Sequence, residues 1–177
     1  FSGSAFVQCP LTADYSAFKL YLDAVDAELI SSGTTALDQP IAQALLSFES
    51  IPERKNKLVV LFTDGEDFSQ NLHDIKQQAS DAHLSIFTIG IGTPEGAPVP
   101  LFDPQGKLIG HQKDAHGGVV ISRLNEGILR TLSQDAGGTY IKATDNDDDI
   151  NHFIKAVHAF EKEQIAERKH SRYEDQY

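Results

Sequence analysis

Apolar and polar positions alternate with the periodicity of an α-helix over the first third of the chain. After Asp14, a residue type that caps helices, apolar side chains recur every three or four residues to about residue 30, which predicts a core-facing helix. A second helix is predicted over residues 36–48, with Pro40 near its first turn. The inward positions are Phe18, Leu22, Val25 and Leu29 in the first helix, and Leu37, Ile41, Ala44, Leu45 and Phe48 in the second.

Two apolar runs in the middle of the chain predict buried strands. The first covers residues 58–62, and the second covers residues 84–92 and is closed by glycines. Residues 70–82 between them have the pattern of a helix. Two strands joined through a helix form a parallel pair with a right-handed crossover. The pattern therefore predicts an α/β fold with a mostly parallel central sheet flanked by helices.

Residues 93–120 break this alternation. Their prolines and glycines exclude a helix, while residues 101–109 predict two short strands around a turn. A long connection that follows the carboxyl end of a strand lies on the ligand side of such a sheet and favours a functional role. We expect Asp103 and Gly106 to form a hairpin tip beside that edge, where they contact a partner.

Helix and strand return in the last third. A helix capped by Ser122 is predicted to run to about residue 134, followed by a strand over residues 139–143. A final helix over residues 148–169 has acids at its positive end, and it becomes mostly charged from Glu161 onward. Its predicted packing face consists of Ile150, Phe153, Ile154, Val157 and Phe160.

The composition narrows the function classes. The 177 residues suit one domain with a substantial core, and the net charge of −11, with 26 acids against 15 bases, argues against a nucleic-acid partner. The lone Cys9 excludes an internal disulfide, and we expect it to be a small buried thiol. Asp145, Asp147 and Asp149 have calcium-loop spacing, but Ile150 occupies the glycine position and Ala156 the acid position of an EF-hand.

Asp64 stands where the first apolar strand ends. The strand runs directly into Thr63, Asp64 and Gly65, and open α/β sheets bind ligands at the carboxyl ends of their strands. Carboxylate and hydroxyl oxygens are the ligands that Mg²⁺ prefers. A strand end whose Asp and Gly serve turn chemistry alone is the alternative. The order of the surrounding elements favours a metal site.

This junction resembles the von Willebrand factor type A (VWA) domain, in which a strand ending in Thr-Asp-Gly supplies one acidic corner of a magnesium site. The resemblance implies a Rossmann-like VWA fold with Asp64 as a ligand of Mg²⁺, Mn²⁺ or Ca²⁺. The family also places a threonine at the mouth of a helix, six residues before an apolar residue. Thr35 meets this spacing with Ile41, whereas the competing Thr34 would put Pro40 at the core position. We favour Thr35.

The family's first metal loop, an Asp-x-Ser-x-Ser run, has no counterpart in this sequence. Residues 14–18 begin the pattern but place Phe18 at the second serine. The chain contains no methionine and opens at Phe1 with the pattern of a strand's end. We therefore expect an excerpt of a longer protein, a VWA domain that lacks its first strand and helix and binds the ion weakly or not at all by itself. Uncovered apolar faces would favour self-association.

Several further segments are similar to the BatA/BatB group of bacterial aerotolerance-operon proteins. They are residues 92–100, Asp103 with Gly106, residues 122–126 and residues 137–140, and residues 172–175 resemble the segment before a membrane-spanning helix. The resemblance implies a VWA domain over residues 1–160 and a charged helical extension over residues 161–177. It also implies anchoring in the inner membrane of a bacterium with the domain in the periplasm, and partnership with a MoxR-type AAA+ ATPase and other Bat-like proteins.

Catalytic motifs are poorly matched. The seven histidines are scattered without the spacing of a zinc helix, and the two glycines at residues 90–92 lack the third glycine of a dinucleotide loop. We therefore expect no enzyme, but a protein-interaction domain that docks a partner carboxylate through the ion, with Glu66 among the contact residues. The alternative is an adaptor that binds through residues 93–120 or the terminal helix without a metal.

Overall fold

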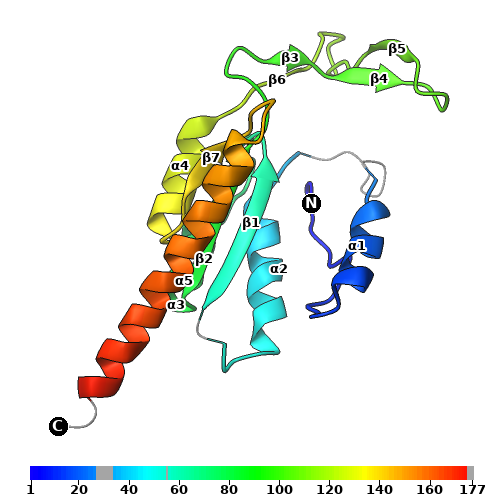
Figure 1. Ribbon diagram of the computed structural model, residues 1–177. Coiled ribbons are helices and arrows are strands. Elements are labelled where there is room, and N and C mark those ends of the chain that lie inside the picture. The colour runs from blue at the N-terminus through cyan, green and yellow to red at the C-terminus, as the bar shows by residue number, and fades with distance from the viewer. Residues whose placement is uncertain (27–33, 55, 175–177) are drawn as a thin grey trace.

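The computed structural model describes residues 1–26, 34–54 and 56–174, and it has a parallel sheet at its centre (Figure 1). The three strands are β1 (Lys57–Thr63), β2 (Leu84–Gly90) and β7 (Tyr140–Lys142), in the order β1-β2-β7. Lys57 pairs with Leu84 and Thr63 with Gly90, so the two long strands end together. The predicted α/β fold and its parallel crossover are confirmed.

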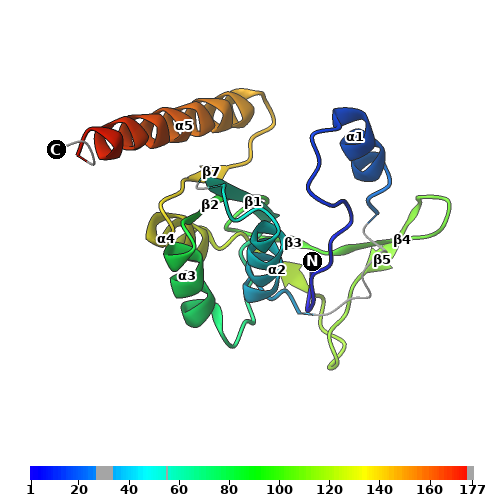
Figure 2. The same ribbon diagram turned by 90° about the horizontal axis from the view of Figure 1, so that it is seen from below.

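Helices cover both faces of this sheet. Figure 2 shows α2 (Asp38–Glu49), α3 (Leu72–Asp81) and α4 (Glu126–Asp135) on one face, and α5 (Asp148–Glu174) on the other. The inward face predicted for α2 is confirmed, because Leu37 and Ile41 are fully buried. The core of this face also includes Leu61, Ile75, Ala79, Leu84, Ile86, Leu124, Leu129, Leu132, Ala136 and Tyr140.

The opposite face is covered more thinly. Phe87 of β2 makes edge-to-face contacts with Phe153 and Phe160 of α5, at centroid distances of 6.3 and 6.2 Å. The other predicted packing positions are less buried than expected, since Ile150 and Ile154 remain 54% and 45% exposed. Two aromatic anchors therefore make the ring contacts of α5 with the sheet.

Among the described residues, none of the helices combines the length and apolarity that crossing a membrane requires.

The first predicted helix is present but does not face the core. Helix α1 (Tyr15–Asp23) is capped by Asp14, whose carboxylate accepts hydrogen bonds from the N–H groups of Ser16 and Ala17. Every residue of α1 is partly or fully exposed, and the expected core positions Phe18, Leu22 and Val25 are 51–57% exposed. Leu29 lies outside the described residues. The prediction was wrong because periodicity identifies an apolar stripe but not a surface that covers it.

The N-terminal segment gives a second correction. Cys9 is partly exposed, not buried, and its thiol contacts the carbonyl oxygen of Pro10 at 3.4 Å. The expectation rested on the usual burial of free cysteine. Here the surrounding residues 1–14 are all partly or fully exposed, and Figure 1 shows this segment beside α1, apart from the sheet.

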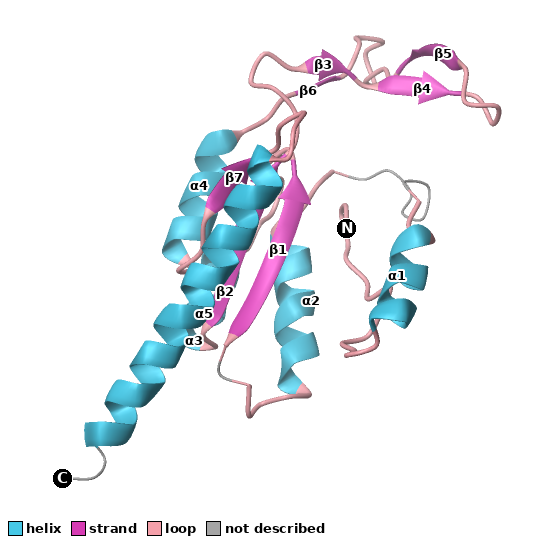
Figure 3. Cartoon of the chain, viewed as in Figure 1, coloured by secondary structure: helices cyan, strands magenta, loops and turns pink. Residues whose placement is uncertain are grey.

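The insertion, residues 93–120, forms two short antiparallel ladders. Strands β4 (Pro100–Phe102) and β5 (Leu108–His111) make the predicted hairpin, while β3 (Ala97–Pro98) pairs with β6 (Ile121–Ser122) just after the insertion. Figure 3 shows both ladders beyond the carboxyl edge of the sheet, with the β4–β5 hairpin on the side of the molecule that carries α1. The apolar hairpin residues Leu101, Phe102, Leu108 and Ile109 are 44–65% exposed.

The start of α4 also differs from the prediction. Ser122 belongs to β6, and the helix cap is Asn125, whose side-chain oxygen accepts a hydrogen bond from the N–H of Ile128 at 3.4 Å. Serine and asparagine both cap helices, so residue type alone does not decide between Ser122 and Asn125. The pairing of Ser122 with Ala97 in the ladder decides between them.

Candidate functional site

The end of β1 carries Asp64 to the edge of the sheet. The N–H of Gly65 donates to the Thr63 hydroxyl at 3.1 Å, which turns the chain sharply after the strand. Gly65 has φ +76°, and a Cβ atom there would lie 2.7 Å from the carbonyl oxygen of Asn125 and 2.9 Å from Leu129 Cγ. Glycine is therefore required at this position, because a side chain would collide with the start of α4.

The following loop caps α2 from outside that helix. Asp67 Oδ1 accepts a hydrogen bond from the N–H of Leu37 at 3.0 Å, and the Ser69 hydroxyl accepts one from the N–H of Asp38 at 3.0 Å. A carboxylate is stabilising at the positive end of a helix. The N–H of Phe68 also donates to the carbonyl oxygen of Thr35 at 2.9 Å. These contacts hold Thr35 against the loop that begins at Asp64.

Three hydrogen bonds fix Asp64 itself. Its Oδ1 accepts from the N–H of Glu66 at 3.1 Å, and its Oδ2 accepts from the hydroxyl of Ser122 at 2.7 Å. Its carbonyl oxygen accepts from the N–H of Asn125 at 2.7 Å. The reasoning from sequence missed Ser122 as a site residue because it assigned that serine to a helix cap. Its position directly after a long insertion on the ligand side was the available signal.

An open hollow of about 580 Å³ brings these residues together. Thr35 and Asp64, the two residues predicted as metal ligands, both line it, and so does Ser122. The remaining lining residues are Phe1, Phe62, Thr63, Ile91 and Gly92. The hollow thus combines one carboxylate and several hydroxyls with an apolar rim.

The three residues predicted to contact a partner do not line this hollow. Glu66 is next to the hollow, and its carboxylate accepts from the N–H of Arg123 at 3.4 Å. Asp103 and Gly106 lie in the turn of the β4–β5 hairpin, where Asp103 accepts from the N–H groups of Gln105 and Lys107 at 3.0 and 2.8 Å. In this structure Asp103 shapes the turn, and a role of these three residues in binding stays a prediction.

The donor set fits a hard cation that keeps much of its water. Mg²⁺ is often bound through one or two carboxylates with waters in the remaining positions. Asp64 supplies one carboxylate, the hydroxyl of Thr35 is a further oxygen donor, and the open hollow leaves room for water. Within the described residues, no cluster of three or more His, Cys, Asp or Glu side chains is placed to hold a metal. One carboxylate alone predicts weak affinity.

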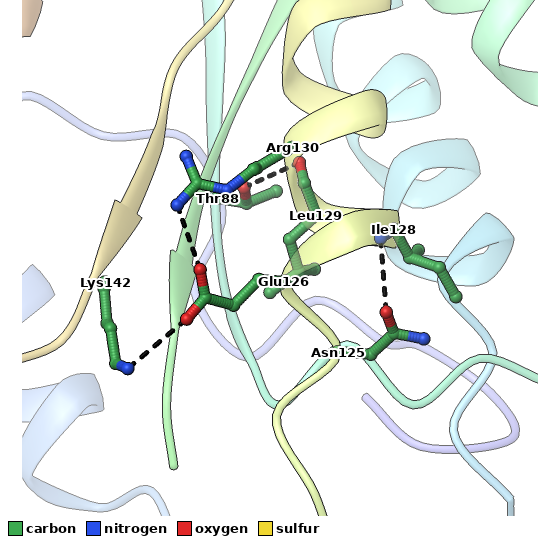
Figure 4. A network of polar contacts seen from close by, with 7 residues as sticks. All are labelled: Thr88, Asn125, Glu126, Ile128, Leu129, Arg130 and Lys142. Atoms are coloured by element: carbon green, nitrogen blue, oxygen red, sulfur yellow. Dashed lines mark hydrogen bonds and ion pairs between the residues drawn. The ribbon is translucent and has the colours of Figure 1, made fainter. Parts of the chain in front are cut away.

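Polar contacts attach α4, whose start supports Asp64, to the sheet (Figure 4). The hydroxyl of Thr88 in β2 donates to the carbonyl oxygen of Leu129 at 3.1 Å and lies 2.7 Å from the hydroxyl of Ser133. Thr88 and Ser133 are both fully buried. Because buried polar groups are costly without partners, these bonds fix the position of α4 on β2.

A charged network ties the outer side of α4 to β7. Glu126 forms ion pairs with Arg130 at 2.9 Å and with Lys142 at 3.3 Å, as Figure 4 shows. The hydrogen bond from Arg130 lowers the pKa of Glu126, with a smaller contribution from Lys142. The Arg130 guanidinium lies 4.4 Å from the ring centroid of Tyr140, and burial raises the pKa of that phenol. The network stabilises the end of α4 nearest the site.

The sequence matches the model of a known protein family. The model of the von Willebrand factor type A domain matches residues 1–102, which is more than half of the sequence. The chain belongs to the von Willebrand factor type A domain family. This confirms the family that the Thr63-Asp64-Gly65 junction suggested and the Rossmann-like fold that it implied. Membership indicates a protein-interaction role.

Two solved structures are similar over most of the chain. A conserved hypothetical protein, BatB from Bacteroides thetaiotaomicron, is 28% identical with a TM-score of 0.81, and the alignment covers 92% of this chain and 77% of that one. An aerotolerance-related membrane protein from Bacteroides fragilis NCTC 9343 is also 28% identical, with a TM-score of 0.78 and coverage of 92% and 76%. A comparison with curated proteins gives no match. The predicted BatB-like character is confirmed.

Proposed function

We propose that this chain is a protein-interaction domain whose sheet edge docks an acidic side chain of a partner protein through a divalent cation. The observation that carries the proposal is the meeting of the Asp64 carboxylate with the hydroxyl residues Thr35 and Ser122 around one open hollow. When bound, Mg²⁺ supplies a positive charge with exchangeable water positions, one of which a partner carboxylate can take. Asp64 and the Thr35 hydroxyl would hold the ion, Ser122 would support Asp64 through its hydrogen bond, and no bond is made or broken.

We further propose a membrane setting. One similar structure is described as an aerotolerance-related membrane protein. From this description and the resemblance of the sequence to the BatA/BatB group, we propose that the domain works at the inner membrane of a bacterium, on its periplasmic side. Its proposed complex contains a MoxR-type AAA+ ATPase and other Bat-like proteins and serves aerotolerance or the stress response. Residues 161–177 then form the charged extension between the domain and the membrane.

Partner capture from the native membranes tests the docking proposal. Crosslinked pull-downs with Mg²⁺ should recover partners with the natural protein and lose them with Asp64→Ala or after chelation by EDTA. Asp74→Ala is the matched control, because it removes an exposed acid from α3 and leaves the hollow intact. Capture that survives both Asp64→Ala and EDTA would refute metal-dependent docking.

A second candidate function is that of an adaptor that binds through the insertion without a metal. The exposed apolar residues Leu101, Phe102, Leu108 and Ile109 favour it, since exposed apolar patches often mark interaction sites. The same pull-down separates the two functions. An adaptor keeps its partners in Asp64→Ala and loses them when Phe102 and Ile109 are both replaced by serine.

A further inference from the structure

The base of the insertion is closed by its own contacts. Strands β3 and β6 pair through Ala97 with Ser122 and Pro98 with Ile121, and the N–H of Leu124 donates to the carbonyl oxygen of Thr93 at 3.0 Å. Residues before and after the insertion are therefore held side by side. Any displacement of β3 is passed to β6 by this ladder.

Gly96 shows how tightly the two sides of the base are packed. It has φ +80°, and a Cβ atom there would lie 2.5 Å from Arg123 Cγ, 2.7 Å from the carbonyl oxygen of Ser122 and 2.9 Å from Ile121 Cγ2. At contacts closer than about 3 Å something must shift, and the contact with Ser122 is to backbone, which yields at a higher cost than the end of a side chain. The place of Ser122 is thus defined by the insertion as well as by the sheet.

Ser122 is also the point at which this base meets the proposed ion site. Its hydroxyl lies 2.7 Å from Asp64 Oδ2, while the N–H of Glu66 occupies Oδ1 at 3.1 Å. The terminal torsion of an aspartate is broad by itself, so two donors on the two oxygens set the plane of the carboxylate. Each oxygen has a second lone pair, which leaves it free to bind a cation.

We propose that Ser122 is a positioning residue that orients the Asp64 carboxylate for the ion and couples the insertion to the ion site. This inference rests on the proposed function, because it assumes that a divalent cation binds at Asp64. Partners that orient a ligating carboxylate typically change metal affinity by about 10- to 100-fold when they are removed. The insertion then contributes to ion binding through Ser122 without touching the ion.

Manganese titration measures the role of the hydroxyl. Mn²⁺ is the probe, and the electron paramagnetic resonance signal of the free ion gives its Kd for the whole chain. Ser122→Ala should weaken binding about tenfold, whereas Ser122→Thr keeps a hydroxyl and should restore most of the affinity. Ser80→Ala, which removes an exposed hydroxyl from α3, should bind like the natural chain. Melting temperatures should be nearly equal in all four proteins.

A pair of glycine variants measures the coupling. Gly96→Ala displaces the backbone of Ser122 but keeps every site side chain, so Mn²⁺ affinity should fall several-fold. Gly106→Ala is the matched control, because its φ of +77° imposes similar strain while its Cβ would meet nothing within 4 Å. Equal affinity of the two variants would overturn the coupling to the insertion.

The outcomes separate this inference from the proposed function. If the natural chain binds Mn²⁺ in a manner that Asp64→Ala abolishes, but Ser122→Ala binds equally well, the role of Ser122 is refuted and the ion site stands. If Asp64→Ala leaves Mn²⁺ binding unchanged, the ion site is refuted and the role of Ser122 with it.

Discussion

Helices α1 and α2 share an apolar stripe in the sequence but differ in what the fold does with it. Asp14 caps α1 from within its own segment, and the stripe of α1 remains exposed. The start of α2 is capped by Asp67, which lies 30 residues from Leu37 in the sequence. The apolar stripe of α2 is fully buried at Leu37 and Ile41. Local signals thus suffice to form a helix. A cap from a distant residue also determines where the helix packs, because it holds the helix against another element.

The largest expected effect tests burial in the two helices. Ile41→Ala in α2 should lower the free energy of unfolding by about 2–5 kcal/mol, since it opens a cavity in a fully buried position. Leu22→Ala in α1 should change it by less than about 0.5 kcal/mol, as expected for exposed sites. Urea denaturation followed by circular dichroism measures both. Equal losses would mean that α1 is packed in solution.

The two caps provide the next comparison. Asp67→Ala should cost about 1–2 kcal/mol of stability, because it removes the side chain that accepts the N–H of Leu37 and a favourable charge at the start of α2. Asp14→Ala should reduce the helix signal slightly and leave the main melting transition in place. Thermal melts that record both the helix signal and the main melting transition test this prediction. A global loss from Asp14→Ala would contradict the independence of α1.

A smaller effect concerns the charged end of α4. The pKa of Glu126 is lowered in the fold, so its contribution is present above the unfolded value of about 4.3 and is lost as the pH falls through the folded value. Its side chain is 26% exposed, so solvent screening limits the gain to less than about 1 kcal/mol. Glu126→Gln should therefore lower the melting temperature at pH 7, and the difference should shrink as the pH falls below the unfolded value. A difference that does not change with pH would exclude this charge effect.

The smallest effect is expected for the hairpin. Replacing residues 99–120 with a short Gly-Ser turn keeps β3 and β6 and removes residues that are mainly exposed. Loop length changes closure entropy by about 0.6 kcal/mol per doubling, so the melt should stay nearly unchanged. Differential scanning calorimetry gives the comparison. A loss of several kcal/mol would show that the hairpin packs against the domain.

The sequence was most informative where a local pattern predicts the structure of the same segment. The apolar run before Thr63-Asp64-Gly65 predicted β1 and the place of Asp64, and helical phase selected Thr35, which lines the same hollow. The first follows from a continuous apolar run and the second from the 3.6-residue period of a helix. The cap of α2 by Asp67 and the contact of Ser122 with Asp64 join residues 30 and 58 positions apart, which no local pattern encodes.

Asp103 and Gly106 lie in the hairpin turn where the sequence predicted them, and their role in binding stays a prediction. One other difference has the same origin as the missed long-range contacts. Cys9 was expected to be buried from the habits of its residue type, but burial depends on what other segments cover. Such coverage is a property of the whole fold.

Localised manganese binding tests the central claim most directly. Mn²⁺ broadens the NMR signals of nearby amides, so a titration of the natural chain should first broaden residues around Thr35, Asp64 and Ser122. Asp64→Asn should remove that broadening, whereas Asp147→Asn, in the exposed acidic stretch before α5, should not. Broadening confined to residues 145–149, with the Asp64 region unchanged, would contradict an ion site at the sheet edge.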